Sequence, residues 1–273
     1  MDLWNTIIVN PFINTLLFIY NIVGHNFGLA IIVFTFLIRL LTHPLMMKQI
    51  KSSSAMQELQ KNPRWIEAQE KYKGDKEKLA QEQMAIYKEL GINPFASCLP
   101  TLIQFPIMFG LYQAIISAMA NTPIDILNLI RHIYPGVIDT AALIPLNKAF
   151  LWMDLSQPER LVIPGLGFGI PILTILVVLT TYIQGKLITP ASTGGNKDQT
   201  AMMGNMMNLY MPFFMGYLAY TLASGLALYF VASNLVSILQ YGMLGKLNWA
   251  AVFPFLNKEA APTTQKQLPK KKK

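Results

Sequence analysis

The sequence predicts an all-α polytopic membrane protein with five transmembrane helices, a cytoplasmic helical hairpin and an outer interfacial helix. Of its 273 residues, 53% are hydrophobic and only 13% are charged, which is about half the charged share of soluble domains. The apolar residues are concentrated in runs of about 20, the length that a helix needs to cross a bilayer. Lys and Arg are distributed unevenly between the segments that join these runs, and this asymmetry orients membrane helices.

Residues 1–25 are predicted to form an amphipathic helix on the outer surface of the membrane. Phe12, Leu16, Ile19 and Val23 follow helical spacing, while asparagines such as Asn14 lie away from that stripe. Residues 26–28 leave little room for a reversal, so a helix lying in the interface is favoured over one that spans. The alternative, a spanning helix, would move the N-terminus inside and leave every later orientation unchanged.

Residues 26–245 are predicted to form the core. It begins with FGLAIIVFTFLIRLLTHPL, in which Arg39 lies well inside an apolar run. An arginine there costs about 2.5–3.5 kcal/mol on insertion scales, and it usually faces protein or water rather than lipid. Thr35 lies one turn earlier on the same face. We interpret the pair as lining a water-accessible site; the alternative is that the long Arg39 side chain reaches the nearby interface.

The later spans carry packing and turn signals. The third is expected to open with a small-residue packing surface at Gly165, Gly167 and Gly169. The fourth and fifth are joined by residues 223–225, which are too few for anything but a tight antiparallel hairpin. The five predicted spans are residues 27–45, 97–119, 165–184, 202–222 and 226–244.

Polar segments connect the spans. Residues 46–96 are predicted to form a helical hairpin that turns at Lys73-Gly74-Asp75 and is kinked or restarted at Asn62-Pro63. Its sparse apolar stripe, at Leu79, Met84, Tyr87 and Leu90, predicts weak docking. Residues 121–163 are expected to be a long loop outside the membrane, and residues 246–273 a disordered basic tail.

The positive charges orient the chain. Lys and Arg number nine in 46–96, two in 186–200 and seven in the tail, against three in 121–163. The positive-inside rule therefore places the hairpin and the tail in the cytoplasm and the N-terminus outside. The four lysines at 270–273 suit ribosomal RNA or anionic lipid by charge; a merely topogenic, solvated tail is the alternative.

Polar side chains recur at similar depth in the inner halves of the spans. If they face one another, they line a hydrophilic groove that is closed toward the outside; the alternative is ordinary hydrogen bonding between helices. No Asp or Glu occurs in any predicted span, so Arg39 favours the groove. The candidate groove and substrate-binding residues are Arg39, Thr35, Gln104, Gln184, Tyr229, Phe230, Ser233 and Asn234.

Motifs for covalent chemistry are missing from the sequence. It contains no P-loop, HExxH or GxSxG motif, a single cysteine (Cys98) and three scattered histidines. We therefore expect no enzymatic activity, no cofactor, no metal site and no small-molecule substrate.

Three stretches resemble the YidC-type membrane protein insertases, the YidC/Oxa/Alb family, in its short bacterial form without a large periplasmic domain. They are FTFLIRLLTHPLMMKQ, KGDKEKLAQEQMAIYKELGINPFASCLPTLIQFPIMFGLYQAI and SGLALYFVASNLVSILQ. The resemblance implies a five-helix core whose groove opens to cytoplasm and lipid and carries Arg39. The chain departs from the family pattern at Ala223, where a proline is usual, and at Phe230, where a hydrogen-bonding ring often follows Tyr229.

The resemblance implies a membrane protein insertase and chaperone of the bacterial cytoplasmic (inner) membrane. It would receive nascent membrane proteins from the cytoplasm, help short polar tails across and release apolar segments into lipid. Its expected partners are nascent membrane proteins, the Sec translocon, the ribosome through the tail, and membrane lipids. The alternative is a folding or assembly scaffold without translocation activity.

Overall fold

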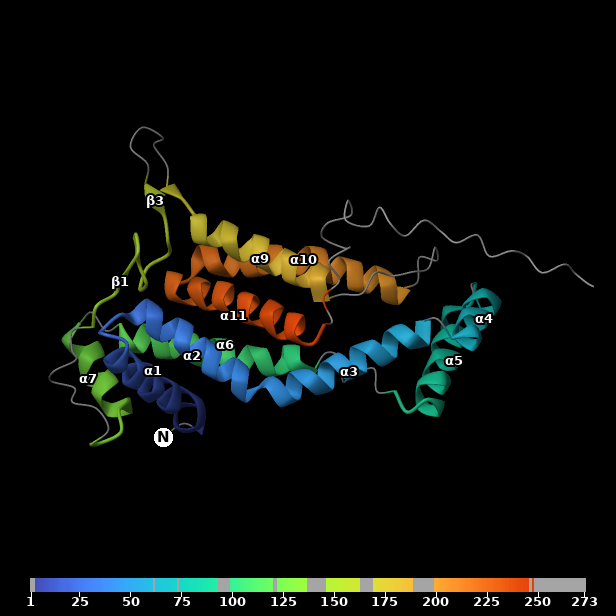
Figure 1. Ribbon diagram of the computed structural model, residues 1–273, viewed down its shortest axis with the longest axis horizontal. Helices are drawn as coiled ribbons and strands as arrows, with labels where there is room; N and C mark the ends of the chain where they lie inside the picture. The colour runs from blue at the N-terminus through green and yellow to red at the C-terminus, as the bar shows by residue number, and fades with distance from the viewer. Residues whose placement is uncertain are drawn as a thin grey trace, which may run out of the picture.

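Long apolar helices lie side by side and form the body of this protein, a computed structural model that describes residues 3–60, 62–72, 74–92, 99–119, 122–136, 146–162, 169–188, 199–245 and 247. Figure 1 shows these helices along the longest axis, with α4 and α5 at one end and α7 and the strands at the other. The body consists of α2 (Phe27–Leu41), α6 (Leu99–Ala118), α9 (Ile172–Ile188), α10 (Gln199–Thr221) and α11 (Ser224–Met243).

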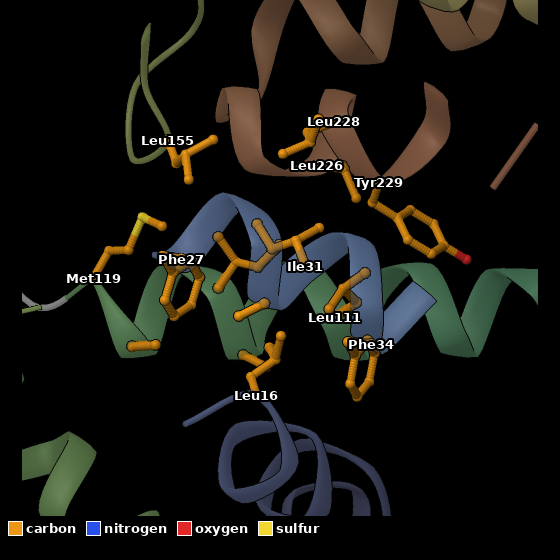
Figure 2. Packing of buried hydrophobic residues seen from close by; sticks show 14 of the residues in the cluster. Leu16, Phe27, Ile31, Phe34, Leu111, Met119, Leu155, Leu226, Leu228 and Tyr229 are labelled. Atoms are coloured by element: carbon orange, nitrogen blue, oxygen red, sulfur yellow. The ribbon is translucent and has the colours of Figure 1, made fainter. Parts of the chain in front are cut away.

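Helix α11 is the centre of this arrangement and packs against α2, α6, α9 and α10. The apolar core lies between α2, α6, α11 and the N-terminal helix, and Leu16, Ile31, Leu111 and Leu226 converge there (Figure 2). Only Leu222 and Ala223 separate α10 from α11, which confirms the tight hairpin.

The N-terminal segment is a π-helix, η1 (Asn5–Val9), that runs directly into α1 (Asn10–Ile22). Both pack on α6, and α1 also packs on α2. Asn14, which lies away from the predicted apolar stripe, is nevertheless packed, because the residue is only 5% exposed. The Asn14 amide donates to the carbonyl of His132 (2.9 Å), and its oxygen accepts from the amide of Tyr134 (2.8 Å).

The polar hairpin leaves the body through α3 (His43–Gln60) and continues as α4 (Pro63–Lys71) and α5 (Lys76–Glu89). The Asn62 side chain caps α4 and Pro63 occupies its first turn, so the predicted restart at Asn62-Pro63 is confirmed. Asp75, the last residue of the predicted turn, accepts a hydrogen bond from the amide of Lys78 and caps α5.

The segment expected to be a loop is more ordered than the sequence analysis predicted. It contains α7 (Pro123–His132), which a reciprocal Thr122–Asp125 capping box begins. Two short antiparallel pairs follow, β1 (Ala149–Phe150) with β2 (Met153–Asp154), and β3 (Leu161–Val162) with β4 (Gly169–Ile170).

The predicted start of the third span is wrong where the structure describes it. Gly169 lies in strand β4, and the helix begins at Ile172. The helix begins late because the Glu159 carboxylate accepts a hydrogen bond from the Leu173 amide (3.0 Å) at the helix N-terminus. Gly165, Gly167, Cys98 and the lysines of the tail lie outside the described residues.

Within the described residues, two helices are long and apolar enough to cross a membrane by length and composition: Asn5–Ile22 and Ser224–Met243. Phe27–Leu41 and Ile172–Leu187 are apolar but shorter. The structure therefore shows a mostly helical protein, while the five spans remain a prediction.

Candidate functional site

Helix α11 carries four of the predicted site residues and distributes them among its neighbours. Tyr229 contacts α6, Ser233 contacts α2 and Asn234 contacts α9. Because the three contacts occur within about one and a half turns of α11, they form a single polar layer across the bundle. We call it the α11 polar layer.

The contact between α2 and α11 is the most unusual member of this layer. The Arg39 Nε donates to the Ser233 hydroxyl oxygen (3.0 Å), and its Nη2 donates to the same atom. Arg39 is half-buried and Ser233 is 3% exposed. None of the ion pairs in the described part of the chain involves Arg39. A permanently charged fork with five N–H donors is thus held by one neutral oxygen.

The other contacts of the layer connect neutral groups. The Gln104 amide nitrogen donates to the Tyr229 hydroxyl, joining α6 to α11. In Figure 2 the Tyr229 ring lies at the edge of the apolar cluster with its hydroxyl pointing away from Leu226. The Asn234 amide nitrogen donates to the hydroxyls of Thr180 (3.0 Å) and Thr181 (2.9 Å) on α9. These are the hydrogen bonds between helices that the sequence left open as an alternative.

Two predicted residues, Thr35 and Phe230, add no hydrogen bond to the layer, and the described structure shows none for the third, Gln184. Thr35 is fully buried, and its hydroxyl donates to the Ile31 carbonyl of its own helix (2.7 Å). Phe230 is 6% exposed and packs against Tyr229, with ring centroids 5.8 Å apart. Gln184 is half-buried on α9, one turn after Thr180. Their predicted contact with a client remains a prediction.

The sequence analysis missed two residues beside Arg39. The Gln240 amide nitrogen donates to the main-chain carbonyl of Arg39 (3.1 Å) and lies 3.4 Å from the His43 Nδ1. Ser233, Ser237 and Gln240 follow the i, i+4, i+7 spacing of one helical face. That spacing, read together with Arg39, could have identified Gln240 from sequence.

The start of α11, at the predicted outer end of the bundle, is covered by β2 and the residues that follow it. Main-chain amides at the start of α11 donate to this segment, Ser224 to the Gln157 carbonyl (2.8 Å) and Gly225 to the Leu155 carbonyl (3.0 Å). The Ser224 hydroxyl donates to the Asp154 carbonyl (2.7 Å). Leu155 is fully buried and faces the α2–α11 contact (Figure 2). We call residues 153–157 the outer plug.

The polar hairpin has a small core of its own. Leu59, Trp65, Ala68, Ile86 and Tyr87 bury one another, whereas the predicted stripe residues Met84 and Leu90 are 45% and 47% exposed. Burial raises the pKa of the Tyr87 hydroxyl. Arg64 forms ion pairs with Glu82 and Glu89 across the hairpin. Among the described residues, no group of three or more His, Cys, Asp or Glu could hold a metal ion.

Comparison with known proteins identifies the family. The 60Kd inner membrane protein family matches residues 18–248 of the sequence. The chain belongs to this family, the YidC-type membrane protein insertases. Membership agrees with the prediction that the chain is not an enzyme.

Relatives of both long and short form support the assignment. The membrane protein insertase YidC of Oceanobacillus iheyensis is 34% identical and covers 89% of this chain, which spans 84% of that protein. The membrane protein insertase MisCA of Bacillus subtilis is 34% identical; the match covers 87% of this chain and 77% of MisCA. YidC of Syntrophobacter fumaroxidans is 36% identical, but this chain spans only 37% of it.

A solved YidC structure has a related fold. The active YidC insertase, with its first transmembrane domain resolved, superposes with a TM-score of 0.53 at 25% identity, covering 88% of this chain and 47% of that one. The predicted short form agrees instead with the Oceanobacillus relative, because this chain spans 84% of that protein.

Proposed function

We propose that this protein inserts nascent membrane proteins into the bacterial cytoplasmic membrane, using Arg39 as a transient site for short acidic tails. In this proposal the five predicted spans cross the bilayer, with the N-terminus outside and the hairpin and tail in the cytoplasm. The α11 polar layer is the floor of a hydrophilic groove that opens to cytoplasm and lipid. Clients arrive alone or from the Sec translocon, and the basic tail contacts the ribosome.

One observation carries the proposal: Arg39 has a neutral partner. A buried guanidinium in lipid needs acceptors, and a structural arginine normally has a carboxylate beside it. The single hydroxyl of Ser233 leaves several Arg39 N–H donors available to water or to a carboxylate. An acidic tail entering the layer would complete the ion pair without first displacing a protein carboxylate.

The N-terminal helix supports the proposed orientation. A Cβ atom at Gly110 would meet Ile8, and the indole nitrogen of Trp4 donates to Gln113, so η1 lies beside the outer half of α6. Starting from there, α1 runs toward Val23 at the outer end of α2. A helix that covers only part of the depth of α6 fits an oblique or interfacial position better than a complete span.

The proposal is tested with purified protein in proteoliposomes and a single-span client that has a short acidic N-terminal tail. We expect Arg39→Ala to reduce tail translocation at least tenfold, because the tail loses its counter-charge, and Arg39→Lys to retain much of it. A client with an uncharged tail is the control and should be affected little.

An unchanged translocation rate with Arg39→Ala, at equal protein level, would contradict the proposal. If the client nevertheless reached its folded state only when the protein was present, the scaffold function would be favoured instead. Protease protection of the tail distinguishes the two outcomes, because a scaffold would leave the tail on its original side.

A further inference from the structure

Arg39 is attached to α11 at two points, and only one of them involves its side chain. Ser233 binds the guanidinium, and Gln240, two turns further along α11, binds the main-chain carbonyl of the same residue. The first contact acts on the charge. The second acts on the backbone that carries the charge.

The Arg39 carbonyl needs an external donor because of its place in the helix. α2 ends at Leu41, so Arg39 is among the residues whose carbonyls have no regular partner one turn ahead. The Thr42 hydroxyl reaches it only at 3.4 Å, and Thr42 bonds better to the Ile38 carbonyl, at 2.8 Å. Gln240, at 3.1 Å, therefore supplies the better hydrogen bond at this carbonyl.

The orientation of the Gln240 amide follows from the acceptor. A carbonyl oxygen requires the NH₂ group, so the Gln240 Oε1 faces the other way; it is buried and has no hydrogen-bond partner in the described structure. Leaving this buried oxygen without a donor costs free energy. The hydrogen bond that Gln240 donates to the Arg39 carbonyl has to offset that cost.

We propose that Gln240 is a positioning residue for Arg39: its hydrogen bond fixes the end of α2 against α11 and so holds the guanidinium at the depth of Ser233. This inference rests on the proposed function, since it concerns the same charge. Gln240 acts through Arg39, and it does not need to touch the client.

The test replaces Gln240 with Met, which has a similar length and no donor, in the proteoliposome assay described above. Losing one hydrogen bond at a helix end changes the population of the correctly positioned state by roughly three- to tenfold. We therefore expect the rate of acidic-tail translocation to fall by that factor. The client with the uncharged tail should be unaffected. Leu239→Met is the matched control, because Leu239 is 57% exposed on the same turn.

A double variant separates positioning from general stability. If Gln240 acts through Arg39, then Arg39→Ala with Gln240→Met should translocate the acidic tail no worse than Arg39→Ala alone. Equal losses for both clients with Gln240→Met, or an additive loss in the double variant, would overturn the inference.

The two proposals fail differently. If Arg39→Ala leaves translocation of the acidic tail unchanged, the proposed function is removed, whatever the effect of Gln240→Met. A strong effect of Arg39→Ala with no effect of Gln240→Met removes only the positioning role. Gln240→Glu keeps the shape but replaces the NH₂ donor with a carboxylate oxygen that faces the Arg39 main-chain carbonyl, so it should impair translocation of the acidic tail at least as strongly as Gln240→Met.

Discussion

A single charge decides how this bundle is understood. Arg39 could be identified from sequence because an arginine in an apolar run needs an explanation. Its position between α2 and α11 could not, because spacing within one helix says nothing about which residue of another helix will face it. Ser233 was a candidate on depth alone, and the structure adds that it holds the guanidinium.

Thr35 shows the opposite case. It lies one turn before Arg39 and shares its face, so the sequence placed both at the same polar site. In the structure the Thr35 hydroxyl donates a hydrogen bond to the Ile31 carbonyl, one turn earlier in its own helix, as helical threonines can do. A polar residue type therefore predicts a polar site only when its own helix cannot satisfy it.

Asp75 provides a pH-dependent prediction at a single residue. Its pKa lies below the usual value because the Lys78 amide and, secondarily, the Lys78 side chain bind the charged form. A depressed pKa stabilises the fold above the unfolded value of about 3.9 and loses that effect as the pH falls through the lower, folded value.

We expect the amides in the first turn of α5 to keep constant protection from pH 7 to pH 5 and to lose it below about pH 4. Hydrogen exchange of the whole protein in nanodiscs, corrected for intrinsic rates, measures this. Asp75→Asn keeps an acceptor that does not titrate, so its protection should stay flat. The same acid-induced loss in Asp75→Asn would show that another group is responsible.

Among the elements, the start of α9, α7 and the hairpin core show what sequence patterns do not reveal. The third span was expected to start in the glycine-rich stretch, but Glu159, from a distant part of the loop, caps α9 later. α7 was missed although Thr122, Pro123 and Asp125 are helix-start signals. The hairpin core was missed because it depends on Trp65 of α4 packing against Ile86 and Tyr87 of α5. The apolar pattern of α5 alone does not show which of its residues α4 will cover.

Gly225 tests the fit of the outer plug on α11. A Cβ atom there would lie 3.1 Å from Ile115, 3.2 Å from the Leu155 carbonyl oxygen and 3.3 Å from Ile31. Gly225→Val should therefore destabilise the protein by about 1–3 kcal/mol through overpacking, seen as a lower thermal midpoint in detergent.

Gly74→Val is the matched control, since Gly74 has open space around it. An unchanged midpoint for Gly225→Val would mean that the plug does not pack on α11 as the structure shows.

At the scale of the whole molecule, the two ends of the long axis differ in charge in the way that the predicted membrane orientation requires. The hairpin, rich in Lys and Arg, lies at one end of the long axis, and α7 and the outer plug lie at the other (Figure 1). The order and class of the elements follow from hydropathy and charge, so they could be predicted. Contacts across the bundle depend on side-chain fit, so they could not.

This polarity predicts which positions are accessible from each side. In a Cys98→Ser background, a membrane-impermeant maleimide added outside intact cells should label Pro135→Cys, near the end of α7. It should label Lys78→Cys, on α5, only after the cells are opened. Labelling of Lys78→Cys in intact cells would contradict the proposed orientation.

The most direct measurement of the central claim follows an acidic client tail while it is being moved. A photoreactive residue is placed in the tail of an arrested single-span client bound to the protein in membranes, and the crosslinked peptides are mapped. We predict crosslinks to α2 and α11 around Arg39 and Ser233, and their loss with Arg39→Ala. Crosslinks only to lipid and to the hairpin, unchanged by Arg39→Ala, would contradict the account.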